Sequence, residues 1–156
     1  MRIPFARAAV VLAFAASCAL AQSPAVPFTH GQATFTQDGH DATWLLWQGT
    51  LKSVSDPQPG SQANFLFTPD GKPGPEDGGS LLRLTVTKVG PNYLLSAVSI
   101  EGGPAGPELA SYRDTKAKCK LAVTRFDENG VAGSSACTGT FVGGAMITKL
   151  YFSATP

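Results

Sequence analysis

Two histidines and a scatter of carboxylates are the residues with which this 156-residue chain would do acid–base or metal chemistry. His30 and His40 do not form the His-Glu-x-x-His motif of zinc enzymes, and the chain has no Cys-x-x-Cys motif of the kind found in other zinc sites. His40 lies within Asp38-Gly39-His40-Asp41, where a glycine among short polar residues is typical of a tight turn. We therefore interpret this tetrapeptide as a turn, and we expect neither a metal site nor a cofactor.

The carboxylates leave one enzymatic alternative open. Pairs of carboxyl groups hydrolyse glycosidic bonds when the fold brings them within about 5–10 Å of each other. Most acidic residues here lie in Gly- and Pro-rich segments, where a solvated loop charge is the usual role. These residues are Asp56, Asp70, Glu76, Asp77, Glu101 and Glu108. We assign no catalytic residue, and a small hydrolase that uses loop carboxylates is an alternative to a non-catalytic protein.

A nucleophilic serine is not indicated by the sequence either. Gly133-Ser134-Ser135-Ala136 departs from the Gly-x-Ser-x-Gly elbow, and no strand-to-helix junction surrounds it. A serine nucleophile also needs a base and a third group that orients the base.

Trp44 and Trp47 are the candidate ligand contacts. They lie in residues 43–52, which are apolar at both parities and so predict a strand that is central in its sheet or covered on both faces. Because alternate residues of a strand point to opposite faces, one indole is expected in the core and the other on the outside. An exposed indole can stack on a sugar ring or a lipid. The alternative is that both are buried.

Cys119 and Cys137 are placed in the sequence as a disulfide pair would be. They flank the turn-forming sequence Asp127-Glu128-Asn129-Gly130 at similar distances, and Asn-Gly readily adopts the left-handed conformations of hairpin turns. If the flanking strands pair, the two cysteines lie within a rung or two of each other, close enough for a disulfide. The Cys-x-x-Cys motif of a redox pair is absent. We therefore predict a structural disulfide.

The first 21 residues predict a cleaved secretory signal. Arg2 and Arg7 precede the apolar run 8–16, and Ala19-Leu20-Ala21 has the small residues that signal peptidase requires, with cleavage after Ala21. The apolar run is too short to span a bilayer as a helix. One alternative is a lipoprotein anchored at Cys18, although Ala15 stands where such signals usually have Leu. Another is an uncleaved apolar anchor.

The charge balance excludes some partners. The chain carries 12 basic and 11 acidic side chains, and loss of Arg2 and Arg7 with the signal leaves 10 and 11. A dedicated nucleic-acid binder has a strongly basic surface, so we expect no nucleic-acid partner. No other long apolar run is present, so we expect no transmembrane segment after signal cleavage.

Alternation with period 2 dominates the rest of the chain. Residues 22–31 predict a flexible leader, and residues 32–156 predict a single β domain. About eight strands, separated by Gly- and Pro-rich turns, favour an antiparallel sandwich or small barrel with one intrachain disulfide. Residues 81–100 and 118–141 are the expected hairpins.

These observations predict an exported, non-catalytic β domain that works by binding in the periplasm or outside the cell. Its ligand would be a glycan, a lipid or an envelope protein, and the sequence does not rank the three. Besides the hydrolase, the remaining alternative is a structural or adhesion subunit that assembles through exposed sheet edges.

Overall fold

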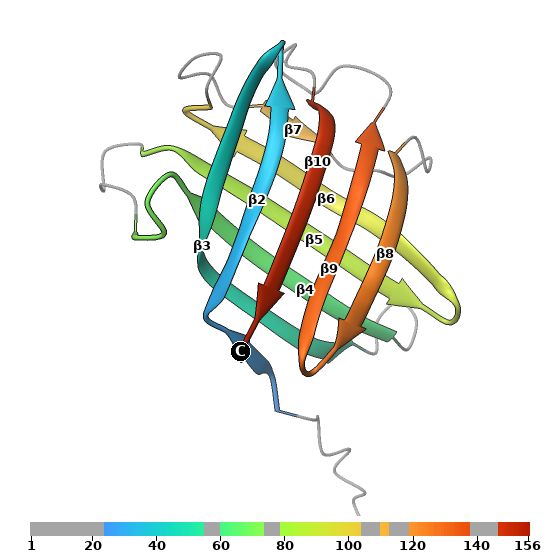
Figure 1. Cartoon of the computed structure of the whole chain (residues 1–156). Coiled ribbons are helices and arrows are strands. Elements are labelled where there is room, and N and C mark those ends of the chain that lie inside the picture. Colours follow the sequence, from blue (N-terminus) through green and yellow to red (C-terminus); the bar gives the residue numbers. More distant parts are fainter. Residues whose placement is uncertain (1–23, 55–59, 74–78, 104–109, 113–118, 138–146) are drawn as a thin grey trace, which may run out of the picture.

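The chain forms a nearly closed antiparallel β-barrel in a computed structural model, which describes residues 24–54, 60–73, 79–103, 110–112, 119–137 and 147–156 (Figure 1). The wall consists of eight long strands. They are β2 (His30–Gln37), β3 (His40–Val54), β4 (Gly60–Thr68), β5 (Leu81–Val89), β6 (Asn92–Glu101), β8 (Cys119–Asp127), β9 (Gly130–Cys137) and β10 (Ile147–Thr155). Two short strands, β1 (Val26–Phe28) and β7 (Ala110–Tyr112), pair with β3 and β6.

The strand order is that of an up-and-down meander. Neighbours along the chain pair from β2 to β7 and from β8 to β10, and the last strand, β10, returns to pair with β2. In Figure 1, strands β4, β5 and β6 cross behind β2, β10 and β9. At the seam between β6 and β8, the rings of Tyr93 and Phe126 pack with centroids 5.4 Å apart. The expected all-β antiparallel class is therefore confirmed, and the described part has the form of a barrel.

The barrel interior is packed with apolar side chains, because the inward positions of each strand are apolar and the outward ones largely polar. Phe65 is central to this core: its ring centroid lies 6.0 Å from those of Phe67 and Phe152 and 6.2 Å from that of Phe28. The largest fully buried side chains are Phe35, Phe65, Phe67, Leu82, Leu84, Leu95, Ile100, Ile147, Leu150, Val86, Val98 and Val131.

One expectation about the first strands needs correction. The segment expected to be a flexible leader carries β1, which pairs with β3, and Phe28 is only 2% exposed in the core. This part of the leader therefore belongs to the barrel. Strand β3 fits the expectation of a central strand, because it pairs with β2 and β4. It is not covered on both faces, since Leu45 and Trp47 are exposed on the outside.

The predicted turns form, although His40 and Asp41 of the expected four-residue turn already belong to β3, where they pair with Gln37 and Thr36. Asp38 and Gly39 have φ values of 48° and 85°, as a two-residue hairpin turn of the primed type requires. The Glu128–Asn129 turn forms differently from the expectation, because Asn129 does not adopt a left-handed conformation. Its backbone N–H instead donates to Oδ1 of Asp127 at 2.8 Å, so an Asx turn links β8 to β9.

The β8–β9 hairpin is also confirmed, and its register places Cys119 opposite Cys137. The disulfide itself stays a prediction. The predicted signal, with Cys18 and the cleavage site after Ala21, lies outside the described residues. Within the described ranges, no helix is long and apolar enough to span a membrane.

Gly133 on β9 provides a test of the packing. A Cβ atom at this position would lie 2.7 Å from the backbone oxygen of Ala122 and 3.0 Å from Cζ of Phe152. We expect Gly133→Ala to lower the free energy of unfolding by about 1–3 kcal/mol, because backbone and a core ring must both shift. Urea denaturation measures the change.

Ser134→Ala is the matched control, because Ser134 is the next residue on β9 and points outward. It should change the free energy of unfolding by no more than about 0.5 kcal/mol. Equal effects of the two substitutions would contradict the close contact at Gly133.

Candidate binding site

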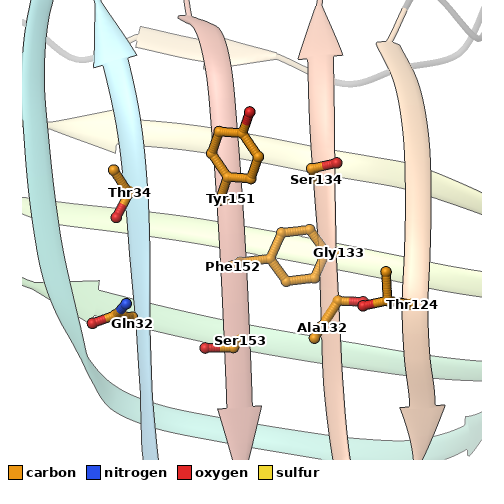
Figure 2. A pocket seen from close by; sticks show the side chains of 9 residues that line it. All are labelled: Gln32, Thr34, Thr124, Ala132, Gly133, Ser134, Tyr151, Phe152 and Ser153. Atoms are coloured by element: carbon orange, nitrogen blue, oxygen red, sulfur yellow. The ribbon is translucent and has the colours of Figure 1, made fainter.

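The outer face of β2, β10, β9 and β8 carries a shallow groove of 380 Å³ (Figure 2). Tyr151 is its most prominent side chain, with 60% of its surface exposed. The lining residues are Gln32, Thr34, Thr124, Ala132, Gly133, Ser134, Tyr151, Phe152 and Ser153.

The groove follows from the alternation of β10. Leu150 and Phe152 point into the barrel, so Tyr151 and Ser153 between and after them point outward. The register places Tyr151 between Thr34 of β2 and Ser134 of β9, as Figure 2 shows. The aromatic ring is thus flanked by a hydroxyl on each side.

A second row of short polar and small side chains runs beside the first. Ser153 lies between Gln32 of β2 and Ala132 of β9. The absence of a side chain at Gly133 leaves room for the Phe152 ring beneath the groove. The floor is therefore partly apolar, whereas Gln32, Ser134 and Ser153 supply polar groups to the lining.

The lining of this groove is uncharged, and most of its residues are polar. Its nine residues include no Asp, Glu, Lys, Arg, His or Cys, so the lining holds no general base, no formal charge and no strong metal ligand. Hydroxyl and amide groups both donate and accept hydrogen bonds, and the phenol ring offers an apolar face. The groove therefore matches an uncharged ligand that is rich in hydroxyl groups.

The structure separates the two tryptophans. Trp44 is 6% exposed in the core, where its ring meets that of Phe35 edge-on with centroids 5.1 Å apart. Trp47 is 36% exposed and is the extra residue in a bulge of β3 opposite β4. Neither lines the Tyr151 groove.

His30, Asp41 and Asp70 each have hydrogen-bond partners, and His40 begins β3 opposite Gln37. Nδ1 of His30 lies 2.8 Å from Oγ1 of Thr29 and 3.0 Å from the backbone oxygen of Pro156. Oγ1 of Thr36 donates to Asp41, and Oδ1 of Asp70 accepts from the backbone N–H of Lys72 at 3.1 Å.

No three His, Cys, Asp or Glu residues within the described ranges form a group that would hold a metal ion. Asp56, Glu76, Asp77 and Glu108 lie outside those ranges, and Glu101 ends β6 opposite Leu81.

Tyr151 is the site residue that the sequence reasoning missed. The signal was available, because Tyr151 shares its parity with Lys149 and Ser153, while Leu150, Phe152 and Ala154 form the apolar set. An aromatic residue on the polar side of an alternating strand is expected to be exposed.

Comparison of the chain with protein-family models, with curated proteins and with solved structures finds no match. The groove and its chemistry are therefore the basis for the functional conclusion.

The positions of the two indoles predict distinct fluorescence. In Trp47→Phe, the remaining Trp44 should emit at short wavelength and resist quenching by acrylamide, because it is buried. In Trp44→Phe, where the ring contact with Phe35 is kept, the remaining Trp47 should be quenched strongly. Equal quenching in the two variants would contradict these placements.

Proposed function

We propose that this protein is an exported, non-catalytic domain that binds an uncharged carbohydrate in the Tyr151 groove. The observation that carries the proposal is the 60% exposed Tyr151 ring, flanked by hydroxyl and amide groups in a lining without charge. Aromatic rings on a sheet stack against the apolar faces of sugar rings, and neighbouring polar groups bond the sugar hydroxyls.

The same observations favour a glycan over a lipid. A lipid chain needs a continuous apolar cavity, and the interior of the described barrel is occupied by its own Phe, Leu, Ile and Val side chains. The groove is shallow and mixes Thr, Ser and Gln with one exposed ring, which suits a polar ligand with an apolar face.

Export and a disulfide complete the proposal. A signal cleaved after Ala21 would deliver the chain to an oxidising compartment, where a Cys119–Cys137 disulfide would persist. The opposite placement of these residues on β8 and β9 supports the bond, because facing Cα atoms on antiparallel strands lie within disulfide range.

Assembly through sheet edges is a second candidate, and one observation favours it. In the described part of the chain, β8 pairs with β9 alone, so its other edge has no hydrogen-bonded strand neighbour. Such an edge can accept a strand from another chain. Oligomers that grow with concentration in light scattering would support this candidate.

Tyr151→Ala tests the carbohydrate proposal. Neutral hexasaccharides with glucose, mannose or N-acetylglucosamine units are titrated into the protein by calorimetry. We expect at least one to bind, and Tyr151→Ala to weaken it about tenfold, since loss of aromatic stacking is worth about 0.5–1.5 kcal/mol beyond area.

Leu94→Ala is the matched control, because Leu94 is also an exposed large apolar residue but lies on β6, outside the groove. It should leave the affinity unchanged. The proposal fails if none of the sugars binds, or if Tyr151→Ala binds as tightly as the unmodified protein.

The disulfide has its own test. Digestion of the exported protein without reductant should yield a peptide pair joined through Cys119 and Cys137. Reduction should lower the free energy of unfolding by roughly 3 kcal/mol, because the bond closes a loop of about 19 residues. The Cys119→Ser, Cys137→Ser double variant should not respond to reductant. Two free thiols in the exported protein would show that the bond is absent.

A further inference from the structure

A second groove, of 280 Å³, lies on the outer face of β3, β4 and β5. These strands contribute Gln48, Thr50, Asn64, Phe65, Leu66, Arg83, Leu84 and Thr85 to its lining. In Figure 1, β4 and β5 cross behind β2, β10 and β9, which line the Tyr151 groove. The two grooves therefore lie on different faces of the barrel.

Arg83 distinguishes this groove from the first one. It is an exposed residue of β5, and the register places it beside Leu66 of β4 and Ser99 of β6. Glu101 lies two residues beyond Ser99, diagonal to Arg83 on the same face. Among the residues that the structure describes, no carboxylate forms an ion pair with Arg83. The guanidinium therefore has its donors available to a ligand.

The polar groups next to Arg83 are partly held in place. Oγ1 of Thr85 donates to Oδ1 of Asn64 at 3.1 Å, and Nδ2 of Asn64 donates to Oε1 of Gln62 at 3.4 Å. These bonds fix the Asn64 amide at the centre of the groove, between Thr50 and Thr85. Gln48 and Thr50 make no side-chain hydrogen bond within the described residues, so they too can bond a ligand.

We propose that this second groove binds an acidic saccharide, with an oxyanion on Arg83 and sugar hydroxyls on Gln48, Thr50 and Asn64. A guanidinium presents parallel N–H groups that match the two oxygens of a carboxylate or sulfate group. The ligand class is therefore a uronate or a sulfate ester on a polar sugar. This proposal stands on Arg83 and does not depend on the Tyr151 groove.

Trp47 provides a local reporter. It directly precedes Gln48 in the β3 bulge and is 36% exposed, whereas the other tryptophan is in the core. A ligand seated beside Gln48 should change the emission of Trp47, and the change should be absent in Trp47→Phe.

The experiment titrates a trigalacturonate, a sulfated trisaccharide and a neutral trisaccharide into the full chain at physiological salt. Tryptophan emission and calorimetry are both recorded. We expect one or both acidic sugars to bind and the neutral one not to change Trp47 emission.

Arg83→Gln should weaken acidic-sugar binding at least tenfold. Arg83→Lys, which keeps the charge but loses the planar fork, should weaken it by a smaller factor. Circular dichroism checks that each variant is folded.

Lys52→Gln is the matched control. Like Arg83→Gln it removes one positive charge, but Lys52 lies on β3 outside the groove lining. It should bind the acidic sugar as the unmodified protein does. Equal losses in Lys52→Gln and Arg83→Gln would show general charge attraction and overturn the proposal, as would no binding of either acidic sugar. If only the uronate or only the sulfated sugar binds, the result identifies whether the groove takes a carboxylate or a sulfate group.

The two sites can fail separately. Tyr151→Ala should keep the affinity for the acidic sugar, and Arg83→Gln should keep the affinity for the neutral hexasaccharide. Loss of acidic-sugar binding in Tyr151→Ala would overturn the assignment to Arg83 and leave the Tyr151 groove as the single site.

Discussion

The pairing of β2 with β10 is the interaction on which the rest of the barrel depends. It joins the first long strand to the last, from His30 opposite Thr155 to Gln37 opposite Ile147. The same ladder builds both sides of the wall: Ala33 faces Phe152 on the inside, and Thr34 faces Tyr151 on the outside. From Lys149 to Thr155 this ladder is regular and its side chains alternate between the two faces, so the core and the Tyr151 groove are set by one register. A slip of one residue would bury Tyr151 and expose Phe152.

The bulge in β3 has a comparable effect on the second groove. Trp44 and Leu46 point inward, and regular alternation would send Gln48 inward as well. The extra residue, Trp47, shifts the phase, so Gly49 is buried and Gln48 lies outside. Beyond the bulge, Thr50 therefore joins Gln48 on the outer face. One inserted residue decides which polar groups accompany Arg83.

This contrast explains how much the sequence could predict. Turns and strands depend on neighbouring residues, so the Asp38–Gly39 turn, the β5–β6 hairpin and the β8–β9 hairpin were predictable from alternation and glycine. The grooves combine residues from strands distant in sequence, such as Thr34 with Tyr151, and require the barrel register. Gly49 lies close to the Trp47 bulge, but a single strand glycine does not show which residue is the extra one, so alternation alone assigns Gln48 to the wrong face.

Because the interior of the described barrel is filled by its own side chains, both proposed sites lie on the outer wall, and this would limit the affinity of each. Grooves of 380 Å³ and 280 Å³ would cover only one side of a sugar, so much of a bound sugar would stay in water and little free energy would be gained per site. Polymers overcome this limit, because after one unit dissociates the next is already at high local concentration. The two proposed sites, with different charge preferences and on different faces of one small domain, would therefore suit repeating polysaccharides better than single sugars.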